Sequence, residues 1–559
     1  KTLGWNPTGV TVTSPSLAIA MGGGKSKGTC EGTDSEAESH SESEESNESE
    51  SSSLAVENGD AHETFVSRLK ACCCSTCGCS PRPNPGRRML HNKVLSPDMQ
   101  GKDVHDFFDF DEQDILGQGG FATVCKAKGK QNNAVRAIKI ILKDKVPKKE
   151  RLEREIQTLF SLDHPNIIKV FTSFEDSKQL YLVMECCEGG ELFDAILEQL
   201  KMSESDAAII MQQIFRALVY LHENGVCHRD LKPENFLLMK KAPIKDNTLK
   251  IIDFGIAAHF EPGHHHHVTT FTSKVGTPNY VAPEVVTRFP RYTEKVDCWS
   301  AGVIMYILLS GMFPFKEEKT KDTLQKVLTG KYGFPPEVFQ KVSKGAKDLI
   351  RKLLQKNVDQ RLSAKEALKD PWITSCAQLS TVPLSSAVLS NLRKYSAEHR
   401  LKKVALAILA RQQQDDVFAQ LKQQFNELDE NGDGIITFAE LKTGMKKAGL
   451  ATGLSNKELH TLAMSLDADG SGEIDYTEFL AAAMERKSLM QESAVWAAFR
   501  VFDKNDDGRI SKKELEDVLS SQEVHNAISK DQIERIIKEV DTNGDGFIDF
   551  NEFMAMIRS

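Results

Sequence analysis

The sequence has no uninterrupted hydrophobic run long enough to cross a membrane as a helix. Such a helix needs about 20 consecutive apolar residues. The longest candidate, VIMYILLSGMFPF from Val303, is broken by serine, glycine and proline. An excess of positive charge is missing as well, since the formal net charge is -9 at pH 7. These two absences argue against a membrane-spanning protein and against nucleic acid as a partner.

A disulfide framework is also missing. The 12 cysteines fall into an N-terminal group (Cys30, Cys72, Cys73, Cys74, Cys77 and Cys79) and six scattered positions further along. Scattered cysteines without regular spacing are typical of reduced thiols in a reducing compartment. We therefore expect a cytoplasmic protein. A chain of 559 residues is too long for one core and predicts two or three domains plus linkers.

The N-terminal region carries lipidation signals. Residues 1–20 hold no interpretable pattern, and we expect them to be a non-native or upstream extension. Met21 then begins MGGGKS, which is typical of N-myristoylation at Gly22. One myristoyl chain binds a membrane only marginally, so a second signal is needed. KACCCSTCGC, residues 70–79, offers palmitoylation sites at Cys72, Cys73 and Cys74.

A metal site is the alternative reading of that cysteine cluster, because Cys74 and Cys77 form a C-x-x-C pair. No histidine is close to the pair, which favours lipid and predicts association with the cytoplasmic face of a membrane. The intervening SEAESHSESEESNESESSS is too acidic and polar to bury a core. Residues 21–105 are therefore predicted to form a disordered tail.

Residues 106–373 contain phosphotransfer motifs, beginning with the glycine-rich sequence LGQGGFATV. The backbone amides of such a loop close over the phosphates of ATP, and its flanking apolar residues enclose the adenine. The predicted ATP contacts in this loop are Leu116, Gly117, Gly119 and Val124.

The next motifs supply charges for the phosphates. Lys139 in RAIK is expected to hold the α and β phosphates. In the following RLEREIQTL, predicted to be helical, Glu155 is the preferred ion-pair partner of Lys139 and Glu153 is the competing candidate. In LYLVMECCEGGELFD, the backbone groups of Glu185 and Cys187 are expected to bind adenine.

The catalytic residues are predicted from two further motifs, HRDLKPEN and DFG. Asp230 orients and accepts the substrate hydroxyl proton, Lys232 neutralises the transferred phosphoryl group, and Asn235 and Asp253 hold Mg²⁺. Downstream, Glu284 of APE is expected to pair with Arg361. Asp297 is expected to brace the catalytic loop from below.

Four copies of a twelve-residue calcium-loop pattern follow. Each begins with Asp, has Gly at position 6 and ends in Glu, which is the EF-hand arrangement for Ca²⁺. Isoleucine at position 8 suits a short strand that pairs adjacent loops, so two lobes are expected. The predicted ligands at positions 1, 3, 5, 7 and 12 are Asp429, Asn431, Asp433, Ile435 and Glu440; Asp467, Asp469, Ser471, Glu473 and Glu478; Asp503, Asn505, Asp507, Arg509 and Glu514; and Asp541, Asn543, Asp545, Phe547 and Glu552.

Two of the loops carry an additional acid at position 9, Asp475 and Asp549, where the others have Thr437 and Ser511. We expect these two loops to bind calcium more tightly. The motifs together resemble the calcium-dependent protein kinases of plants and protists over roughly residues 106–559. The resemblance implies an α+β bilobal kinase fold, then an all-α calmodulin-like domain of four EF-hands in two lobes (residues 423–559). It also implies ATP, Mg²⁺ and Ca²⁺ as cofactors and protein substrates phosphorylated on Ser or Thr.

The segment between these domains, residues 374–422, is predicted to be an autoinhibitory junction. Its stretch Val388–Gln412 is basic, and one helical face carries the apolar positions Leu401, Val404, Ala405, Ile408 and Leu409. Calmodulin lobes bind basic amphipathic helices of this kind. The resemblance implies that the junction restrains the kinase until the calcium-loaded lobes capture it. Methionines expected to line the capturing groove are Met445, Met464, Met484, Met554 and Met556.

Two further expectations concern substrate choice and the activation segment. Glu191 and Glu234 match acidic positions that meet substrate arginines in basophilic relatives, although each could be an ordinary surface charge. Ser273 occupies the position where the family usually carries a Glu that answers Arg229. A neutral hydroxyl cannot balance that guanidinium, so Ser273 is a predicted phosphorylation site, with Thr272 as its neighbour.

Overall fold

The structure, a computed structural model, describes most of the chain from residue 99 onward. The described residues are 99, 101–119, 122–146, 148–199, 202–260, 271–377, 384–413, 418–450, 455–468, 470–485, 492–519 and 530–559. The lipidation predictions at Gly22, Cys72, Cys73 and Cys74 lie outside these residues, as does the predicted calcium ligand Asp469. No helix in the described ranges is long and apolar enough to span a membrane.

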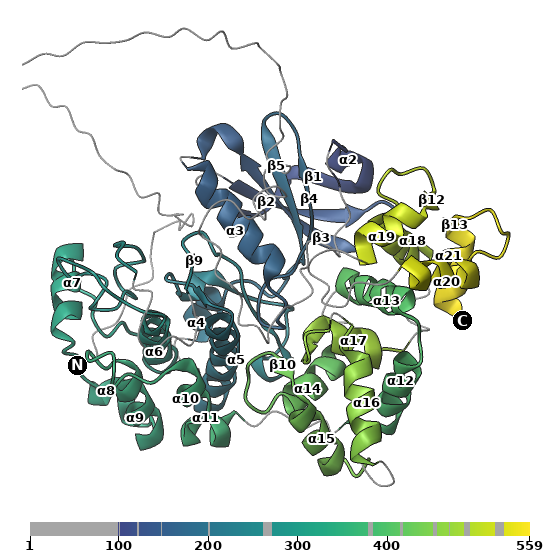
Figure 1. The fold of residues 1–559 in the computed structure, drawn as a ribbon. Helices are drawn as coiled ribbons and strands as arrows, with labels where there is room; N and C mark the ends of the chain where they lie inside the picture. Colours follow the sequence, from purple (N-terminus) through teal and green to yellow (C-terminus); the bar gives the residue numbers. More distant parts are fainter. Residues whose placement is uncertain are drawn as a thin grey trace, which may run out of the picture.

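The kinase N-lobe is an antiparallel five-stranded sheet in the order β1-β2-β3-β5-β4 with one long helix (Figure 1). Ile138 and Ile140 of β3 point into the core on one face of this sheet. Because side chains alternate along a strand, Lys139 between them lies on the opposite face, toward the C-lobe. The elements are α2 (Val104–Phe107), β1 (Phe108–Gln118), β2 (Ala122–Gly129), β3 (Val135–Leu142), α3 (Lys149–Ser161), β4 (Val170–Glu175) and β5 (Gln179–Met184).

The C-lobe is mainly helical, and the two lobes share one continuous core. Its central helix α6 (Lys295–Ser310) is buried along its whole length after the first residue, which explains the apolar run that begins within it at Val303. The other elements are α4 (Leu192–Gln199), α5 (Glu204–Glu223), β6 (Val226–Cys227), β7 (Phe236–Leu238), β8 (Leu249–Ile251), β9 (Ala258–His259), α7 (Thr320–Thr329), α8 (Pro336–Phe339), α9 (Lys344–Leu353), α10 (Ala364–Leu368) and α11 (Pro371–Cys376).

The calcium-binding part consists of two EF-hand pairs. Each pair is joined by a two-residue antiparallel bridge in which the position-8 isoleucines face each other, Ile436 with Ile474 and Ile510 with Ile548. The first pair contains α14 (Ala419–Leu428), β10 (Ile435–Ile436), α15 (Phe438–Lys447), α16 (Asn456–Leu466), β11 (Ile474–Asp475) and α17 (Tyr476–Ala483). The second contains α18 (Glu492–Phe502), β12 (Arg509–Ile510), α19 (Lys512–Leu519), α20 (Lys530–Val540), β13 (Ile548–Asp549) and α21 (Phe550–Arg558).

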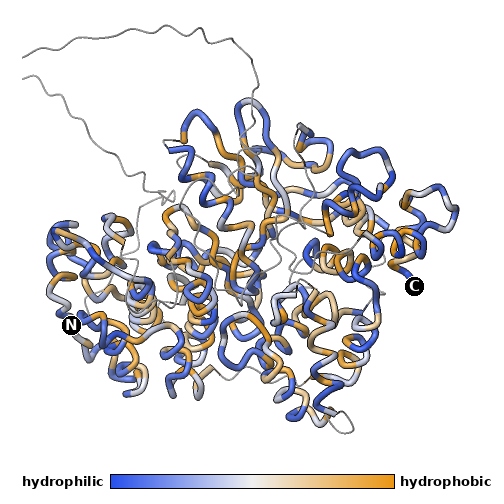
Figure 2. The backbone as a smooth tube through the Cα atoms, viewed as in Figure 1, coloured by the Kyte–Doolittle hydropathy of each residue, from blue (hydrophilic) through white to orange (hydrophobic). Residues whose placement is uncertain are grey.

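The predicted architecture, a bilobal kinase followed by four EF-hands in two lobes, is therefore confirmed. Figure 1 shows the EF-hand pairs stacked beside the kinase, the first next to α5 and the second next to the N-lobe sheet. Figure 2 shows hydrophobic residues concentrated inside both halves and hydrophilic residues in the loops around β12 and β13.

The junction differs from its prediction, because it forms two helices instead of one. Helix α12 (Ser386–Ser396) ends at Ala397, and α13 (Arg400–Gln412) begins after His399, whose ring nitrogen accepts a hydrogen bond from the Lys402 N–H. A side chain that caps a helix start in this way favours a break, because it satisfies a backbone donor that a continuous helix would pair internally.

The five predicted apolar positions of the junction helix are buried as expected, but the burial extends beyond that single face. Helix α13 is buried on every side from Leu401 to Arg411, except for a half-buried Lys403. The reason is that α13 lies between both EF-hand pairs, in contact with α17 of the first and with α18 and α21 of the second. Of the predicted groove methionines, Met445, Met484, Met554 and Met556 are buried in this cluster, but Met464 is half exposed on α16 and lies outside it.

Candidate functional site

The cleft between the kinase lobes brings together residues from β3 and α3. The Lys139 Nζ lies 3.0 Å from Glu155 Oε1, so the structure pairs Lys139 with the preferred helix residue. Glu155 raises the pKa of Lys139 above its ordinary value, and Asp253 raises it further, against the opposing effect of burial. Lys139 is therefore held as a cation in a largely desolvated position, where it can bind phosphate oxygens.

Asp230 stands in a network of polar groups from the catalytic loop and the activation segment. Its carboxylate accepts hydrogen bonds from the Thr277 hydroxyl at 2.7 Å and from the Lys232 ammonium at 2.9 Å. The side-chain amide of Asn235 donates to the Asp230 backbone carbonyl at 2.9 Å, which fixes the loop between these two residues. A carboxylate oriented by a hydroxyl and an ammonium group can position and deprotonate a substrate hydroxyl.

Asp253 lies on the other side of the cleft beside Lys139. Burial opposes its ionisation, but Lys139 and the Gly255 N–H, which donates to its carboxylate at 2.9 Å, lower its pKa below the ordinary value. The neighbouring Phe254 is buried and packs edge-on against His228. Asp253 is thus held ionised in the cleft, as a carboxylate that binds a divalent cation must be.

A hydrogen-bonded carboxylate and an ion pair support the loops that carry these residues. The fully buried Asp297 accepts hydrogen bonds from the backbone N–H groups of His228 and Arg229 and from the His222 ring. Arg361 donates to the Glu284 carboxylate through its two terminal guanidinium nitrogens. The brace beneath the catalytic loop and the Glu284–Arg361 pair therefore form as expected.

The remaining predicted ATP residues lie on β1, on β2, between these two strands, and directly after β5. Leu116, Gly117 and Gly119 are exposed, and Val124 is half-buried. The Glu185 carboxylate is buried and lies 2.8 Å from the Lys250 Nζ, so the side chain of Glu185 is engaged inside the protein. Cys187 follows at the end of the hinge and is half-buried.

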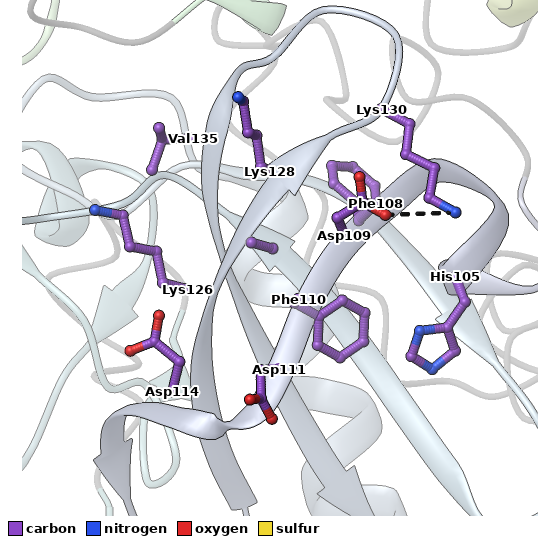
Figure 3. Close-up of a pocket in the computed structure, with 11 residues that line it drawn as sticks. His105, Phe108, Asp109, Phe110, Asp111, Asp114, Lys126, Lys128, Lys130 and Val135 are labelled. Carbon is purple, nitrogen blue, oxygen red and sulfur yellow. Dashed lines mark ion pairs between the residues drawn. The ribbon is translucent and has the colours of Figure 1, made fainter.

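A different cavity, of about 580 Å³, lies on the outer surface of strands β1 and β2 (Figure 3). Lys126 and Lys128 of β2 line it together with Lys130, which follows the strand and lies 3.5 Å from Asp109. Its lining includes none of the predicted ATP or catalytic residues. The cavity is lined by apolar side chains and by charged side chains of both signs, and it is distinct from the predicted catalytic residues.

The calcium loops have similar internal hydrogen bonding. In each, the position-1 carboxylate accepts a hydrogen bond from the N–H of the position-6 glycine, namely Gly434, Gly472, Gly508 and Gly546. In each, the position-12 glutamate also accepts backbone N–H groups of its own loop. Within the described residues, no three His, Cys, Asp or Glu side chains are already arranged as a metal cluster.

Burial of these carboxylates supports their assignment to a cation site. Glu478, Asp503, Glu514 and Glu552 are each less than 9% exposed, and Asp429 is 1% exposed. Burial raises the pKa of Asp429 to about 7 and also raises the pKa of Asp503. Buried carboxylates are costly unless a cation compensates them, so the donor set of the loops fits Ca²⁺.

The sequence reading missed residues that only the fold brings to these sites. Thr277, which donates to Asp230, lies 47 positions further along the chain. Arg136 of β3 donates to the Gln412 carbonyl of α13, and Arg411 of α13 donates to the Val170 carbonyl of β4. None of the sequence motifs marks Thr277 or the two arginines.

Comparison with known proteins agrees with this geometry. The protein kinase domain family matches residues 110–373, and the EF-hand domain pair family matches residues 418–484 and 492–558. The chain is 42% identical over 460 residues to calcium-dependent protein kinase 3 of Plasmodium berghei (strain Anka), covering 81% of each protein. It is 40% identical to calcium-dependent protein kinase 11 of Oryza sativa subsp. japonica, covering 84% of this chain and 79% of the relative. It is 39% identical to calcium-dependent protein kinase 21 of Arabidopsis thaliana, covering 86% of this chain and 91% of the relative.

The Lys139–Glu155 pair leads to a first prediction. Glu155→Gln should lower kcat/KM for ATP about 100-fold, because Lys139 loses the carboxylate that positions it. Steady-state kinetics with varied ATP would measure this. Glu153→Gln, a change two residues away on the same helix, is the control and should leave kcat/KM nearly unchanged. Equal losses in the two variants would contradict the assignment.

Proposed function

The chain belongs to the calcium-dependent protein kinases and is a calcium-activated Ser/Thr protein kinase, and we propose which of its residues perform the transfer and which transmit calcium. Its reaction moves the γ-phosphoryl group of ATP to a Ser or Thr hydroxyl of a protein. The observation that supports this assignment best is the Lys139–Glu155 pair at 3.0 Å beside Asp253. In this proposal Lys139 binds phosphate, Asp253 binds a divalent cation, and Asp230 acts on the substrate hydroxyl.

In this proposal the protein groups position the nucleotide and the substrate. Lys139 holds the α and β phosphates, and the backbone of Glu185 and Cys187 holds adenine, enclosed by Leu116, Gly117, Gly119 and Val124. Bound Mg²⁺ neutralises phosphate charge, and Asn235 and Asp253 are the residues that would hold it. Asp230 orients the attacking hydroxyl and accepts its proton, while Lys232 stays beside it to balance the transferred group.

Calcium regulation acts, we infer, through helix α13. Its apolar residues are buried together with those of both EF-hand pairs, and Lys403 donates to the Ser465 carbonyl of the first pair at 2.8 Å. A ligand shifts such an equilibrium only if it binds one arrangement better. Calcium bound by the four loops would therefore stabilise the arrangement in which α13 is held by the EF-hands. At resting calcium, the junction of residues 374–422 would restrain the kinase instead.

Lipidation at Gly22, Cys72, Cys73 and Cys74, and the membrane association that follows from it, remain predictions from the sequence. The preference of the kinase for substrates with basic residues near the phosphorylated Ser or Thr is also a prediction from the sequence. For that preference, the environment of two glutamates offers support. Burial raises the pKa of Glu191 and of Glu234. At Glu191 the neighbouring Asp194 carboxylate raises the pKa further, whereas at Glu234 Lys232 opposes the rise more than Asp230 adds to it. A substrate arginine would relieve this repulsion.

A second prediction tests calcium regulation. Phosphate transfer to a basic peptide should be strong with calcium and nearly absent with EGTA. The double variant Glu478→Gln, Glu552→Gln removes the bidentate ligands of the loops expected to bind most tightly. It should raise the calcium concentration for half-maximal activity by about tenfold or more. Glu427→Gln, an exposed change on α14 outside the loops, is the matched control. An unchanged calcium midpoint in the double variant would refute the ranking of the loops.

A third prediction concerns substrate choice. Glu191→Gln and Glu234→Gln should each raise KM for an arginine-containing peptide about tenfold, the loss of one charge-assisted hydrogen bond, with little change in kcat. Because both pKa values are raised, the carboxylates become protonated at a higher pH than an ordinary glutamate. The preference for arginine should therefore weaken as pH falls through that raised range. Glu337→Gln on α8 serves as a control, and equal KM values in all variants would argue for ordinary surface charges.

A fourth prediction concerns Ser273. The Arg229 guanidinium donates to the Ser273 hydroxyl oxygen at 3.0 Å, and the Tyr292 hydroxyl donates to the Ser273 carbonyl at 2.7 Å. A phosphate there would add about -1.5 to -2 charges directly beside the guanidinium and order the segment. Phosphorylation at Ser273, or at neighbouring Thr272, should therefore raise calcium-saturated activity about tenfold.

Phosphatase treatment of the purified protein provides the measurement for Ser273. Treated protein should be less active at saturating calcium, Ser273→Ala should reproduce that loss, and Ser273→Glu should partly restore activity. If all three preparations match the untreated enzyme, the activation segment orders without phosphate and the proposal is wrong.

A further inference from the structure

The first calcium loop, residues 429–440, is buried against the kinase domain. Asp429 and Asp433 are 1% and 2% exposed, and Ile435 is buried as well. The third and fourth loops present their position-5 residues, Asp507 and Asp545, to solvent. Loop 1 is therefore part of an interface, whereas these two loops are open on the same side.

The position-6 glycines show the same contrast. A Cβ atom placed on Gly434 would lie 2.5 Å from the Tyr220 ring of α5, and one on Gly432 would collide with Leu368 of α10. A Cβ atom on the corresponding glycine of the other loops would meet nothing within 4 Å (Gly472, Gly508 and Gly546). Because Gly432 and Gly434 have no side chains, loop 1 packs directly against the C-lobe.

Arg216 of α5 holds this loop from the kinase side. Its guanidinium donates to the Asn426 carbonyl at 3.1 Å and to the Asp429 carbonyl at 3.3 Å, and lies 3.7 Å from the Asp429 carboxylate. Asn426 is in the last turn of α14, where carbonyl groups have no partner within the helix. Arg216 therefore caps α14 and stands next to the first predicted ligand of loop 1.

This position has an electrostatic consequence for calcium. Loop 1 has three carboxylates among its predicted ligands, Asp429, Asp433 and Glu440, because Asn431 at position 3 is neutral. The Arg216 guanidinium lies 3.7 Å from the Asp429 carboxylate, which is 1% exposed. The guanidinium stabilises the carboxylate without calcium, and it repels a divalent cation bound to the same carboxylate.

We propose that Arg216 is a positioning residue of the first calcium site: the kinase domain supplies the charge that keeps loop 1 seated on α5 and thereby lowers the affinity of loop 1 for calcium. The calcium response of this loop then depends on its contact with the kinase, which distinguishes it from loops 3 and 4. The inference rests on the proposed binding of calcium by these loops.

The test isolates loop 1 in the full-length chain. The parent is a triple variant in which loops 2, 3 and 4 lose their position-12 glutamates (Glu478→Gln, Glu514→Gln and Glu552→Gln). Loop 1 is then the loop that retains its position-12 glutamate. Calcium binding is then measured by equilibrium dialysis with radioactive calcium. Arg216→Met keeps the aliphatic stem without the charge and should tighten calcium binding about tenfold. Arg216→Gln, which is neutral and polar, should match it.

Two further variants separate charge from contact. Arg216→Lys retains a positive charge, although it loses the forked hydrogen bonds, and should stay within about threefold of the parent. Arg351→Met, a change on α9 whose arginine contacts Asp348 and Phe334, should have no effect. Thermal unfolding of each variant shows that the chain remains folded.

Equal or weaker calcium binding in both neutral variants would overturn the proposal. Tighter calcium binding in Arg216→Lys as well as in Arg216→Met and Arg216→Gln would also overturn the proposal, because the charge would then not be responsible. If the parent shows no measurable calcium binding, the appearance of binding in Arg216→Met supports the proposal. If neither the parent nor Arg216→Met binds calcium, the proposal is overturned. If the native chain with four intact loops fails to bind calcium, the proposed function itself is rejected.

Discussion

The burial of helix α13 holds the calcium-binding part and the kinase in one arrangement. Its apolar side chains join the cores of both EF-hand pairs, while its last residues reach the N-lobe sheet. Arg411 is almost fully buried and donates to the Val170 carbonyl at 2.9 Å. Burial lowers the pKa of Arg411 to about 10, and Asp163 and Asp475 oppose this effect. A buried arginine is costly unless neighbouring groups compensate its charge, so this contact depends on the correct placement of the kinase, α13 and the first EF-hand pair.

Two kinase arginines perform similar tasks at this junction. Arg136 donates to the Gln412 carbonyl at the end of α13, and Arg216 donates to the Asn426 carbonyl at the end of α14. A helix C-terminus carries partial negative charge and unpaired carbonyls, so a cation there stabilises the helix. The kinase domain thus caps both helices that lead into the EF-hands. A displacement of either helix would expose an arginine that is now largely buried.

Several parts of the catalytic cleft could be predicted from motifs because their residues are close in sequence or follow a fixed order. The pairing of Lys139 with Glu155 follows from a strand residue facing the cleft and a helix residue facing the strand. The paired calcium loops follow from isoleucine at position 8. The prediction that Met464 lines the groove was wrong because apolarity does not reveal which helix face meets a partner. The break of the junction into two helices at His399 was missed because periodicity does not reveal where a local cap interrupts a helix.

The sequence by itself determined the kinase lobes, the four calcium loops and the existence of a basic segment between them. These features depend on short motifs whose residues must stand at set spacings to bind phosphate, magnesium or calcium. Only the tertiary structure decided that α13 is buried on all sides, that Thr277 reaches Asp230, and that Arg216 stands beside Asp429. The last two contacts join residues 47 and 213 positions apart. Such contacts arise from the way whole domains pack, and local spacing carries no information about them.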